Sequence, residues 1–193
     1  MREFVVVAHK VPWDGDFSLN DLTGSGGRVD LVARAIGAAF LFSNGIRKDT
    51  RAHLVVNTNP KKPRSIRFES DKLRYLNPDE RNTSSLIRNA LVRCPESGEV
   101  ESSPGVFASR KGFADVLAES QKPLVWLVEG AKRPDWSALR DAAFIVSDQQ
   151  DLTKEEAEIV RKIGATEAGL GERSLHTDHC VVVVNHYLEG AED

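Results

Sequence analysis

Cysteine is scarce in this chain, with only Cys94 and Cys180 among 193 residues. Two cysteines are too few for a disulfide framework, so we expect a protein of the reducing cytoplasm. Long apolar runs are also absent. None approaches the roughly 18 to 20 residues that cross a bilayer, and the first apolar run is too short for a signal peptide. The sequence therefore predicts a cytoplasmic protein without a membrane partner.

What the chain does contain is enough apolar surface for a core. Hydrophobic residues make up 40% of the sequence and charged residues 28%, which is typical of a globular protein. A chain of 193 residues without internal repeats predicts one domain, spanning residues 1–193.

Charge of each sign is concentrated in one half of the chain. Residues 1–93 contain 16 Lys/Arg against 10 Asp/Glu, a net of +6, whereas residues 94–193 contain 10 against 19, a net of −9. A basic cluster would attract a polyanion such as nucleic acid. The alternative is a solvated face balanced by nearby acids, and charge alone does not decide between them. The basic excess is densest at Lys61, Lys62, Arg64, Arg67, Lys72, Arg74, Arg81, Arg88 and Arg93.

Apolar patterning predicts strands that alternate with helices. Runs of β-branched residues indicate strands, and apolar residues three and four positions apart indicate helices. We expect strands at residues 3–9, 52–57, 65–69, 106–109, 124–128 and 144–146. We expect helices at residues 28–42, from residues 77–80 onward, at 112–120, and up to residue 162 after an N-cap at Thr153 with Glu156 in a capping box. Residues 95–104 are expected to be an exposed loop. Alternation of this kind predicts an α/β fold with a mostly parallel sheet.

Residues 169–185, GLGERSLHTDHCVVVVN, change abruptly from a glycine-broken polar stretch to four valines. The valines favour a strand by propensity, but they could equally begin a buried helix. Four interpretations of the polar part compete. His176, His179 and Cys180 could bind zinc, although adjacent ligands reach one ion poorly. Cys180 could be a nucleophile with a histidine base. All three side chains could be structural, or the backbone of this stretch could line a small-molecule pocket.

The small-molecule interpretation is supported by two further loops. Residues 127–130 and 147–150 each follow a predicted buried strand, as residues 169–175 precede the valines. Loops at the ends of parallel strands are where α/β folds bind ligands. Residues 24–27 are a weaker candidate for a phosphate cradle, because LTGSGGR lacks the Walker spacing and lysine and the G-x-G-x-x-G pattern.

Several blocks in order along the chain resemble one family. They are MREF at the N-terminus, SLNDLTGSGGRVDLVARAIGAAFLFSNGIRKDT at residues 18–50, YLNPDERN at 75–82, SSPGVF at 102–107, FIVSD at 144–148 and LHTDHC at 175–180. Together they are similar to the TrmY-type tRNA pseudouridine N1-methyltransferases of the SPOUT superfamily. The resemblance implies a SPOUT-type α/β fold: a mostly parallel sheet flanked by helices, with a C-terminal deep trefoil knot at about residues 122–193. It also implies a homodimer that binds S-adenosylmethionine in the knot.

The resemblance further implies methyl transfer to N1 of pseudouridine in the tRNA T-loop, at position 54. It also implies that Asp30 faces the RNA and that Arg28, Arg47 and Lys48 are RNA contacts. Because N1 must lose a proton, a general base and a group that stabilises the developing anion would help, and Asp30 and Arg28 are the candidate catalytic residues for these two roles. We expect neither a metal nor DNA as a partner. The alternative for Asp30 is an ion pair with Arg34 one helical turn away. The resemblance assigns the cofactor to Leu127, Ser147, Leu170, Gly171, Glu172, Arg173, Ser174, Leu175 and Cys180, where Cys180 is a contact residue.

Two other functions remain open from the sequence. A related SPOUT enzyme could modify a different RNA nucleotide. A non-catalytic, dimeric RNA-binding protein could keep the fold without turnover.

Overall fold

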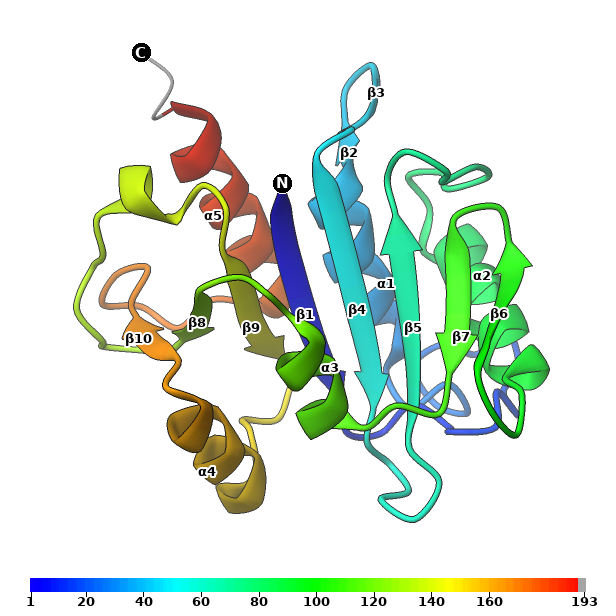
Figure 1. The fold of residues 1–193 in the computed structure, drawn as a ribbon. Coiled ribbons are helices and arrows are strands. Elements are labelled where there is room, and N and C mark those ends of the chain that lie inside the picture. The colour runs from blue at the N-terminus through cyan, green and yellow to red at the C-terminus, as the bar shows by residue number, and fades with distance from the viewer. Residues whose placement is uncertain (191–193) are drawn as a thin grey trace.

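The first apolar run forms strand β1 (Arg2–Ala8), and all seven of its residues are buried. In the computed structural model, which describes residues 1–190, β1 lies in the interior of an eight-stranded sheet with helices on both faces (Figure 1). A strand covered on both faces reads as an unbroken apolar run, which is why this segment lacks polar alternation. The predicted domain extends to residue 193, and residues 191–193 lie outside the described part.

The sheet has a parallel half and an antiparallel half, in the order β10-β8-β9-β1-β4-β5-β7-β6. The four pairings from β10 to β4 are parallel and the three from β4 to β6 are antiparallel. The mostly parallel sheet predicted from the sequence is therefore confirmed. The other strands are β4 (Thr50–Val56), β5 (Arg64–Glu69), β6 (Glu99–Ser103), β7 (Val106–Ser109), β8 (Leu124–Leu127), β9 (Ala143–Ser147) and β10 (Thr166–Ala168).

The prediction of an exposed loop at residues 95–104 was wrong for its second half. Residues 99–103 form β6, the outermost strand of the antiparallel half. Of its five residues only Ser102 is buried. An edge strand that turns most of its side chains to solvent has no apolar pattern to reveal it, and charged residues are common at such edges.

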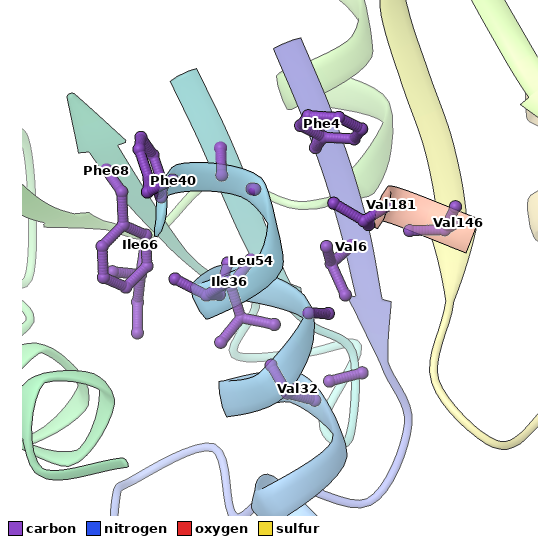
Figure 2. Close-up of a cluster of buried hydrophobic side chains, with 14 of the residues drawn as sticks. Phe4, Val6, Val32, Ile36, Phe40, Leu54, Ile66, Phe68, Val146 and Val181 are labelled. Atoms are coloured by element: carbon purple, nitrogen blue, oxygen red, sulfur yellow. The ribbon is translucent and has the colours of Figure 1, made fainter. Parts of the chain in front are cut away.

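Helices α1 (Val29–Phe40), α2 (Glu80–Arg93) and α5 (Thr177–Gly190) cover one face of the sheet, and α3 (Phe113–Glu119) and α4 (Lys154–Ile163) cover the other (Figure 1). The larger core lies under α1. Figure 2 shows Val32, Ile36 and Phe40 of this helix directed at apolar side chains of the sheet. No helix within residues 1–190 combines the length and apolarity that a membrane span needs.

Helix α1 is shorter than the predicted 28–42. It ends at Phe40, and Leu41–Phe42 form strand β2, which pairs with β3 (Gly45–Ile46) in a hairpin. The turn contains Asn44 and is followed directly by Gly45, and an Asn-Gly pair favours tight hairpin turns as well as helix ends. A short 3-10 helix, η1 (Trp136–Leu139), was not predicted either. The capping box of α4 is confirmed, since Thr153 and Glu156 satisfy each other's backbone N–H groups.

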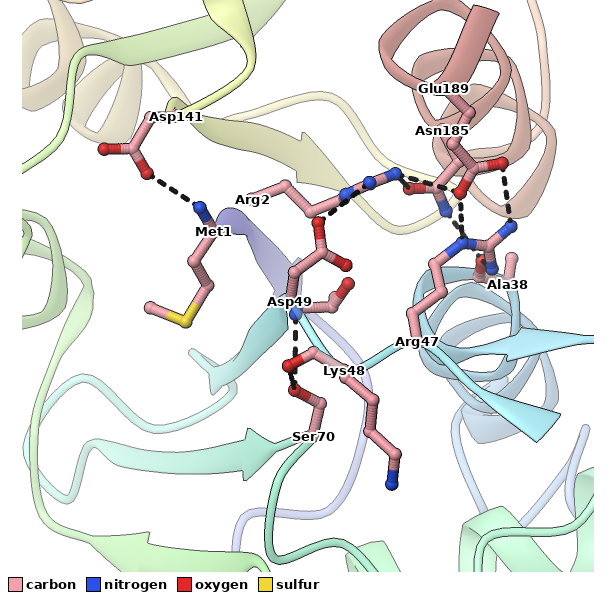
Figure 3. Close-up of polar contacts among 11 residues, drawn as sticks. Met1, Arg2, Ala38, Arg47, Lys48, Asp49, Ser70, Asp141, Asn185 and Glu189 are labelled. Atoms are coloured by element: carbon pink, nitrogen blue, oxygen red, sulfur yellow. Dashed lines mark hydrogen bonds and ion pairs between the residues drawn. The ribbon is translucent and has the colours of Figure 1, made fainter. Parts of the chain in front are cut away.

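The four valines belong to α5, so the second of the two interpretations left open holds. Val181, Val184 and Leu188 face the core at helical spacing. Asn185 is also buried, and it accepts a hydrogen bond from the Arg2 side chain at 3.0 Å and donates to the Ala38 carbonyl at 2.9 Å (Figure 3). These contacts fix the last turns of α5 against β1 and α1.

Candidate functional site

A cavity of about 320 Å³ opens at the carboxyl ends of β8 and β9. Its walls come from the three loops predicted from the sequence, closed by one residue of α1 and the first turn of α5. The strands β8, β9 and β1 are parallel neighbours, so their carboxyl ends meet at the same edge of the sheet.

Eight of the nine predicted cofactor residues line this cavity, and the exposed Glu172 does not. The eight are Leu127, Ser147, Leu170, Gly171, Arg173, Ser174, Leu175 and Cys180. The rest of the lining consists of residues that were not assigned to the cofactor: Leu31, Val128, Glu129, Val146, Asp148, Gln149, Asp151, His176 and Thr177.

The third loop reaches the cavity through a close backbone contact. Gly169 donates its N–H to the Lys132 carbonyl at 3.0 Å, and a Cβ at Gly169 would lie 1.9 Å from the carbonyl oxygen of Ala131. Only glycine fits there. Beyond it, no backbone N–H of residues 170–176 donates to another group of the described chain. Backbone groups of this kind must bind either water or a ligand, so the loop presents a row of donors beside the cavity.

Thr177 and Cys180 bring the start of α5 into the cavity wall. The Thr177 hydroxyl donates to the Ser147 carbonyl at 2.6 Å, which fastens α5 to the end of β9. Burial and the nearby Asp178 carboxylate raise the pKa of the Cys180 thiol to about 11. A reactive cysteine needs a lowered pKa, so this side chain is suited to be a neutral wall and not a nucleophile.

His176, which follows the third loop, and His179 of α5 are both exposed. The rings of His176 and His179 meet edge to face with centroids 5.6 Å apart. Within residues 1–190 no three His, Cys, Asp or Glu side chains are grouped as metal ligands.

A half-buried histidine, His9, contacts Asp148 in the cavity wall. His9 follows β1, and its ring contacts Asp148 through Nδ1 and Glu156 through Nε2, both at 2.9 Å. The backbone N–H of His9 also donates to Asp148, at 2.7 Å, and the Asn57 amide donates to Glu156 at 2.5 Å. With two carboxylates to satisfy, both ring nitrogens donate, and the ring is an imidazolium. This network joins the ends of β1, β4 and β9 to the start of α4.

The opposite charges in this network shift the pKa values of His9 and Glu156 in opposite directions. Burial lowers the pKa of His9, but the hydrogen bonds and charges of Asp148 and Glu156 outweigh burial and raise it to about 9. Burial likewise raises the pKa of Glu156, yet His9, Thr153 and Asn57 bring it down to about 2. The ion pair is therefore charged throughout the neutral range.

Arg28 stands at the N-terminus of α1 in a left-handed conformation, with φ of 67°. Its guanidinium forms a bidentate pair with Asp30, with Nε–Oδ1 and Nη2–Oδ2 distances of 3.0 and 3.1 Å. The Asp30 side chain is 6% exposed and that of Arg28 is 41% exposed. Neither lines the cavity, but Leu31, the next residue after Asp30, does. The pair therefore lies beside the cavity with its cation toward solvent.

Asp30 also forms the predicted ion pair with Arg34, at 3.3 Å. Burial raises the pKa of Asp30, but Arg28 and Arg34 more than offset it and hold the pKa below its usual range. Arg34 in turn reaches Glu80 of α2 at 3.0 Å and Asp178 of α5 at 3.3 Å. One guanidinium thus connects the starts of three helices.

The other two predicted RNA contacts lie at the opposite edge of the sheet, just before β4. Arg47 is held by Glu189 of α5 at 2.6 Å (Figure 3). Its guanidinium also donates to the Leu41 carbonyl at 2.7 Å. The Lys48 side chain is exposed, and the Lys48 carbonyl accepts from Ser70. Their part in RNA binding stays a prediction.

Sequence reasoning missed the His9 network and Leu31 for different reasons. His9 is 139 residues from Asp148 and 147 residues from Glu156 in the sequence, and only the sheet order brings it to them. Leu31 lies within the helix predicted at residues 28–42, but nothing in the sequence shows that this helix closes one side of the cavity.

Comparison with known proteins gives a consistent result. Residues 1–192 match the family described as putative SAM-dependent RNA methyltransferases. A protein of Methanococcoides burtonii is 38% identical over 194 residues, covering 98% of this chain and 96% of its own. One of Methanocella arvoryzae is 40% identical over 187 residues, covering 96% and 97%. One of Haloferax volcanii is 41% identical over 197 residues, covering 99% and 98%. All three are named tRNA (pseudouridine(54)-N(1))-methyltransferase.

Among solved structures, Archaeoglobus fulgidus Nep1 bound to S-adenosylhomocysteine has a similar fold. The TM-score is 0.65 at 14% identity, with 98% of this chain and 97% of that chain covered. At 14% identity this similarity shows a shared fold and nothing about function.

Proposed function

The chain belongs to the family of putative SAM-dependent RNA methyltransferases, and on that premise we propose that it methylates N1 of pseudouridine 54 in the T-loop of tRNA. The observation that carries the proposal is the cavity at the ends of β8 and β9, built from the loops that the sequence assigned to the cofactor. We further propose that the protein acts in the cytoplasm.

The residues of the cavity fit S-adenosylmethionine. Leucines 31, 127, 170 and 175 supply apolar walls for a flat ring. Arg173 supplies a cation for a carboxylate, and Glu129 and Asp151 supply anions for an ammonium group or ribose hydroxyls. The free N–H groups of residues 170–176 provide donors for the ring and the ribose. A volume of about 320 Å³ is in the range of small-molecule sites.

When bound, S-adenosylmethionine supplies an electrophilic methyl group, so the protein must orient the acceptor and manage the proton that N1 loses. Arg28 is placed to stabilise the negative charge that develops on the base, because its guanidinium is partly exposed beside the cavity. Asp30 fixes the guanidinium through both carboxylate oxygens.

Asp30 could act as a general base only after one of its oxygens is released from Arg28. Its lowered pKa keeps it ionised at neutral pH, as a base must be, but both oxygens accept from Arg28. An incoming nucleotide would have to release one of them. We therefore assign Asp30 first to holding Arg28, and proton transfer second.

The C-terminal knot is part of the proposal. The chain after β10 passes against the connection between β8 and β9, where Gly169 packs on Ala131 and bonds to Lys132. It then enters α5, whose Tyr187 stacks on Trp136 of the same connection at 4.9 Å. These two contacts with one connection support a C-terminal segment that is threaded through it.

A homodimer is supported by apolar side chains exposed along α5 and nearby. Val182 of α5 is 52% exposed, Phe42 is 50% exposed and Leu175 is 39% exposed. Sedimentation of the protein and of Val182→Glu tests this assembly. A wild-type monomer would contradict it.

Two experiments test the function itself. Calorimetry with S-adenosylmethionine should show binding, and its absence with and without tRNA would exclude the methyltransferase. Mass spectrometry of tRNA nucleosides from a deletion strain should show loss of N1-methylpseudouridine. Unchanged N1-methylpseudouridine, in a strain with no redundant enzyme, would point to a different RNA target. Cofactor binding without turnover on any RNA would favour a non-catalytic RNA-binding protein.

A further inference from the structure

Three lysines lie at the sheet edge that also carries the cavity. Lys10 follows β1, and Lys61 and Lys62 follow β4. All three are exposed, and none has a carboxylate within ion-pair distance among residues 1–190. We propose that these three lysines bind the phosphates of the RNA strand that leads to the target nucleotide. This inference rests on the proposed function.

The sheet order fixes where these lysines lie. Strand β1 pairs in parallel with β9 on one side and with β4 on the other, so the three carboxyl ends are consecutive. Neighbouring strands are about 4.8 Å apart, which places the chain after β1 one strand spacing, and that after β4 two, from the β9 end of the cavity. A strand of RNA that approaches the cavity from the β1 side would therefore cross both loops.

Contacts between the loops make this edge one continuous surface. His9 bonds to Asp148 in the cavity wall, and the next residue is Lys10. The Thr58 hydroxyl donates to the Val11 carbonyl, which joins the segment after β1 to the loop after β4. A Cβ at Gly27 would lie 1.9 Å from the Lys10 carbonyl oxygen, so the loop that ends in Arg28 packs on Lys10.

Trp13 contacts two basic side chains at the end of this surface that is farther from the cavity. The Lys62 Nζ lies 4.7 Å from the centroid of its ring, and the Arg64 Cζ lies 4.6 Å from it. Arg64 is only 8% exposed and is bonded to the Leu91 carbonyl. Lys62 remains in solvent, with its ammonium group held near the ring.

Three arginines of the basic cluster seen in the sequence differ from these lysines, because each has a carboxylate, carbonyl or amide partner within the protein. Arg67 pairs with Glu69 and Glu99. Arg81 bonds to Leu19 and Asn20, and Arg93 to the Ser102 carbonyl. These three guanidiniums are engaged within the protein, so not every member of the basic cluster is available to bind RNA.

Acidic residues in the same region do not neutralise the lysines directly. Asp14 accepts from the backbone of Asp16, and Asp21 accepts from the N–H groups of Gly24 and Ser25. Both carboxylates thus stabilise their own turns. Asp16 is exposed and is the remaining negative charge of this segment.

The test is the salt dependence of RNA binding. A triple variant, Lys10→Gln, Lys61→Gln and Lys62→Gln, is compared with the wild type for a tRNA transcript at several salt concentrations. Each phosphate contact adds roughly 0.7 to 0.9 to the slope of log affinity against log salt, so the slope should fall by about 2 to 3. Affinity at a fixed moderate salt concentration should fall roughly tenfold or more.

Controls separate this inference from the proposed function. Lys162→Gln removes an exposed lysine at the end of α4 and should match the wild type, whereas Lys62→Gln alone should lower the slope by about 1. Affinity for S-adenosylhomocysteine should be unchanged in every variant. If the wild type methylates a pseudouridine-containing T-arm and the triple variant binds tRNA with an unchanged slope, the inference alone fails. If the wild type binds no tRNA, the proposed function fails with it.

Discussion

Arg34 of α1 contacts Asp178 of α5 at 3.3 Å, and this ion pair connects the two sides of the proposed active site. On one side, Arg34 contacts Asp30, which holds Arg28. On the other, Asp178 directly follows Thr177, whose hydroxyl binds the end of β9 in the cavity wall. The Arg34 guanidinium therefore links the residues placed to act on RNA to those placed to hold the cofactor.

We predict that Arg34→Gln lowers methyl transfer more than it lowers cofactor affinity. The variant removes the contacts of Arg34 with Asp30 and Asp178, so the carboxylate that holds Arg28 is fixed less firmly, while the cavity keeps its lining. We expect kcat to fall by about tenfold or more, because small misplacements of catalytic groups have large effects on rate, and the Kd for S-adenosylhomocysteine to change by a few-fold at most. Single-turnover assays and calorimetry measure the two quantities.

Glu80→Gln is the matched control. It removes the third carboxylate that Arg34 contacts, yet leaves the path between Asp30 and Asp178 intact. It should behave like the wild type in both assays. Equal losses of kcat in the two variants would show that Arg34 acts only by stabilising the helix packing.

The sequence predicted those parts of the site that depend on neighbouring residues, and missed those that depend on residues far apart in the chain. The three cofactor loops were found because each adjoins an apolar run, and runs such as that of β1 are visible locally. The Arg34–Asp178 pair joins residues 144 positions apart, and nothing in the composition of either helix reveals it. Strand β6 was missed because an exposed edge strand has no apolar alternation. The helix of α5 stayed undecided because four valines fit a strand equally well.

The His9 network predicts a loss of stability at alkaline pH. The folded-state pKa of His9 is raised from 6.5 to about 9, so its stabilising contribution is complete below about pH 6.5 and disappears as the pH rises through 9. A shift of this size corresponds to at most about 3 kcal/mol. The melting temperature should therefore fall between pH 7 and pH 9.5.

His9→Gln supplies the comparison, because glutamine cannot lose a proton in this range. Its melting temperature should start lower at pH 7 and change less between pH 7 and pH 9.5. Glu156 has its lowered pKa near 2, so its contribution is lost only in strong acid and does not interfere. If the melting temperatures of the two proteins fell by the same amount between pH 7 and pH 9.5, the assignment of His9 as an imidazolium would be wrong.

Cys180→Ser should weaken cofactor binding without abolishing activity. The thiol lines the cavity and its pKa is about 11, so it contributes apolar contact and no thiolate at neutral pH. Exchange for a hydroxyl costs on the order of 1 kcal/mol of binding, or a several-fold rise in Kd. Calorimetry with S-adenosylhomocysteine measures this change. Full loss of transfer with binding intact would restore the nucleophile hypothesis.

Tyr75 and Arg28 are the two non-glycine residues with positive φ among residues 1–190, at 63° and 67°. A left-handed conformation costs about 1 to 2 kcal/mol in a residue with a Cβ, whereas glycine loses about 0.5 to 1 kcal/mol more entropy on folding. Tyr75 is 70% exposed and loses little burial, so Tyr75→Gly should leave stability equal or raise it by about 1 kcal/mol.

Arg28→Gly relieves the same backbone strain but should have the opposite overall effect. It removes the bidentate partner of the buried Asp30, and loss of a charged hydrogen-bonding partner costs more than the strain it relieves. We expect lower stability and at least a hundredfold slower methyl transfer, while Tyr75→Gly keeps the wild-type rate. Urea unfolding and single-turnover assays on both variants make the comparison. Normal transfer in Arg28→Gly would mean that the strain at Arg28 serves the fold of the loop and not the reaction.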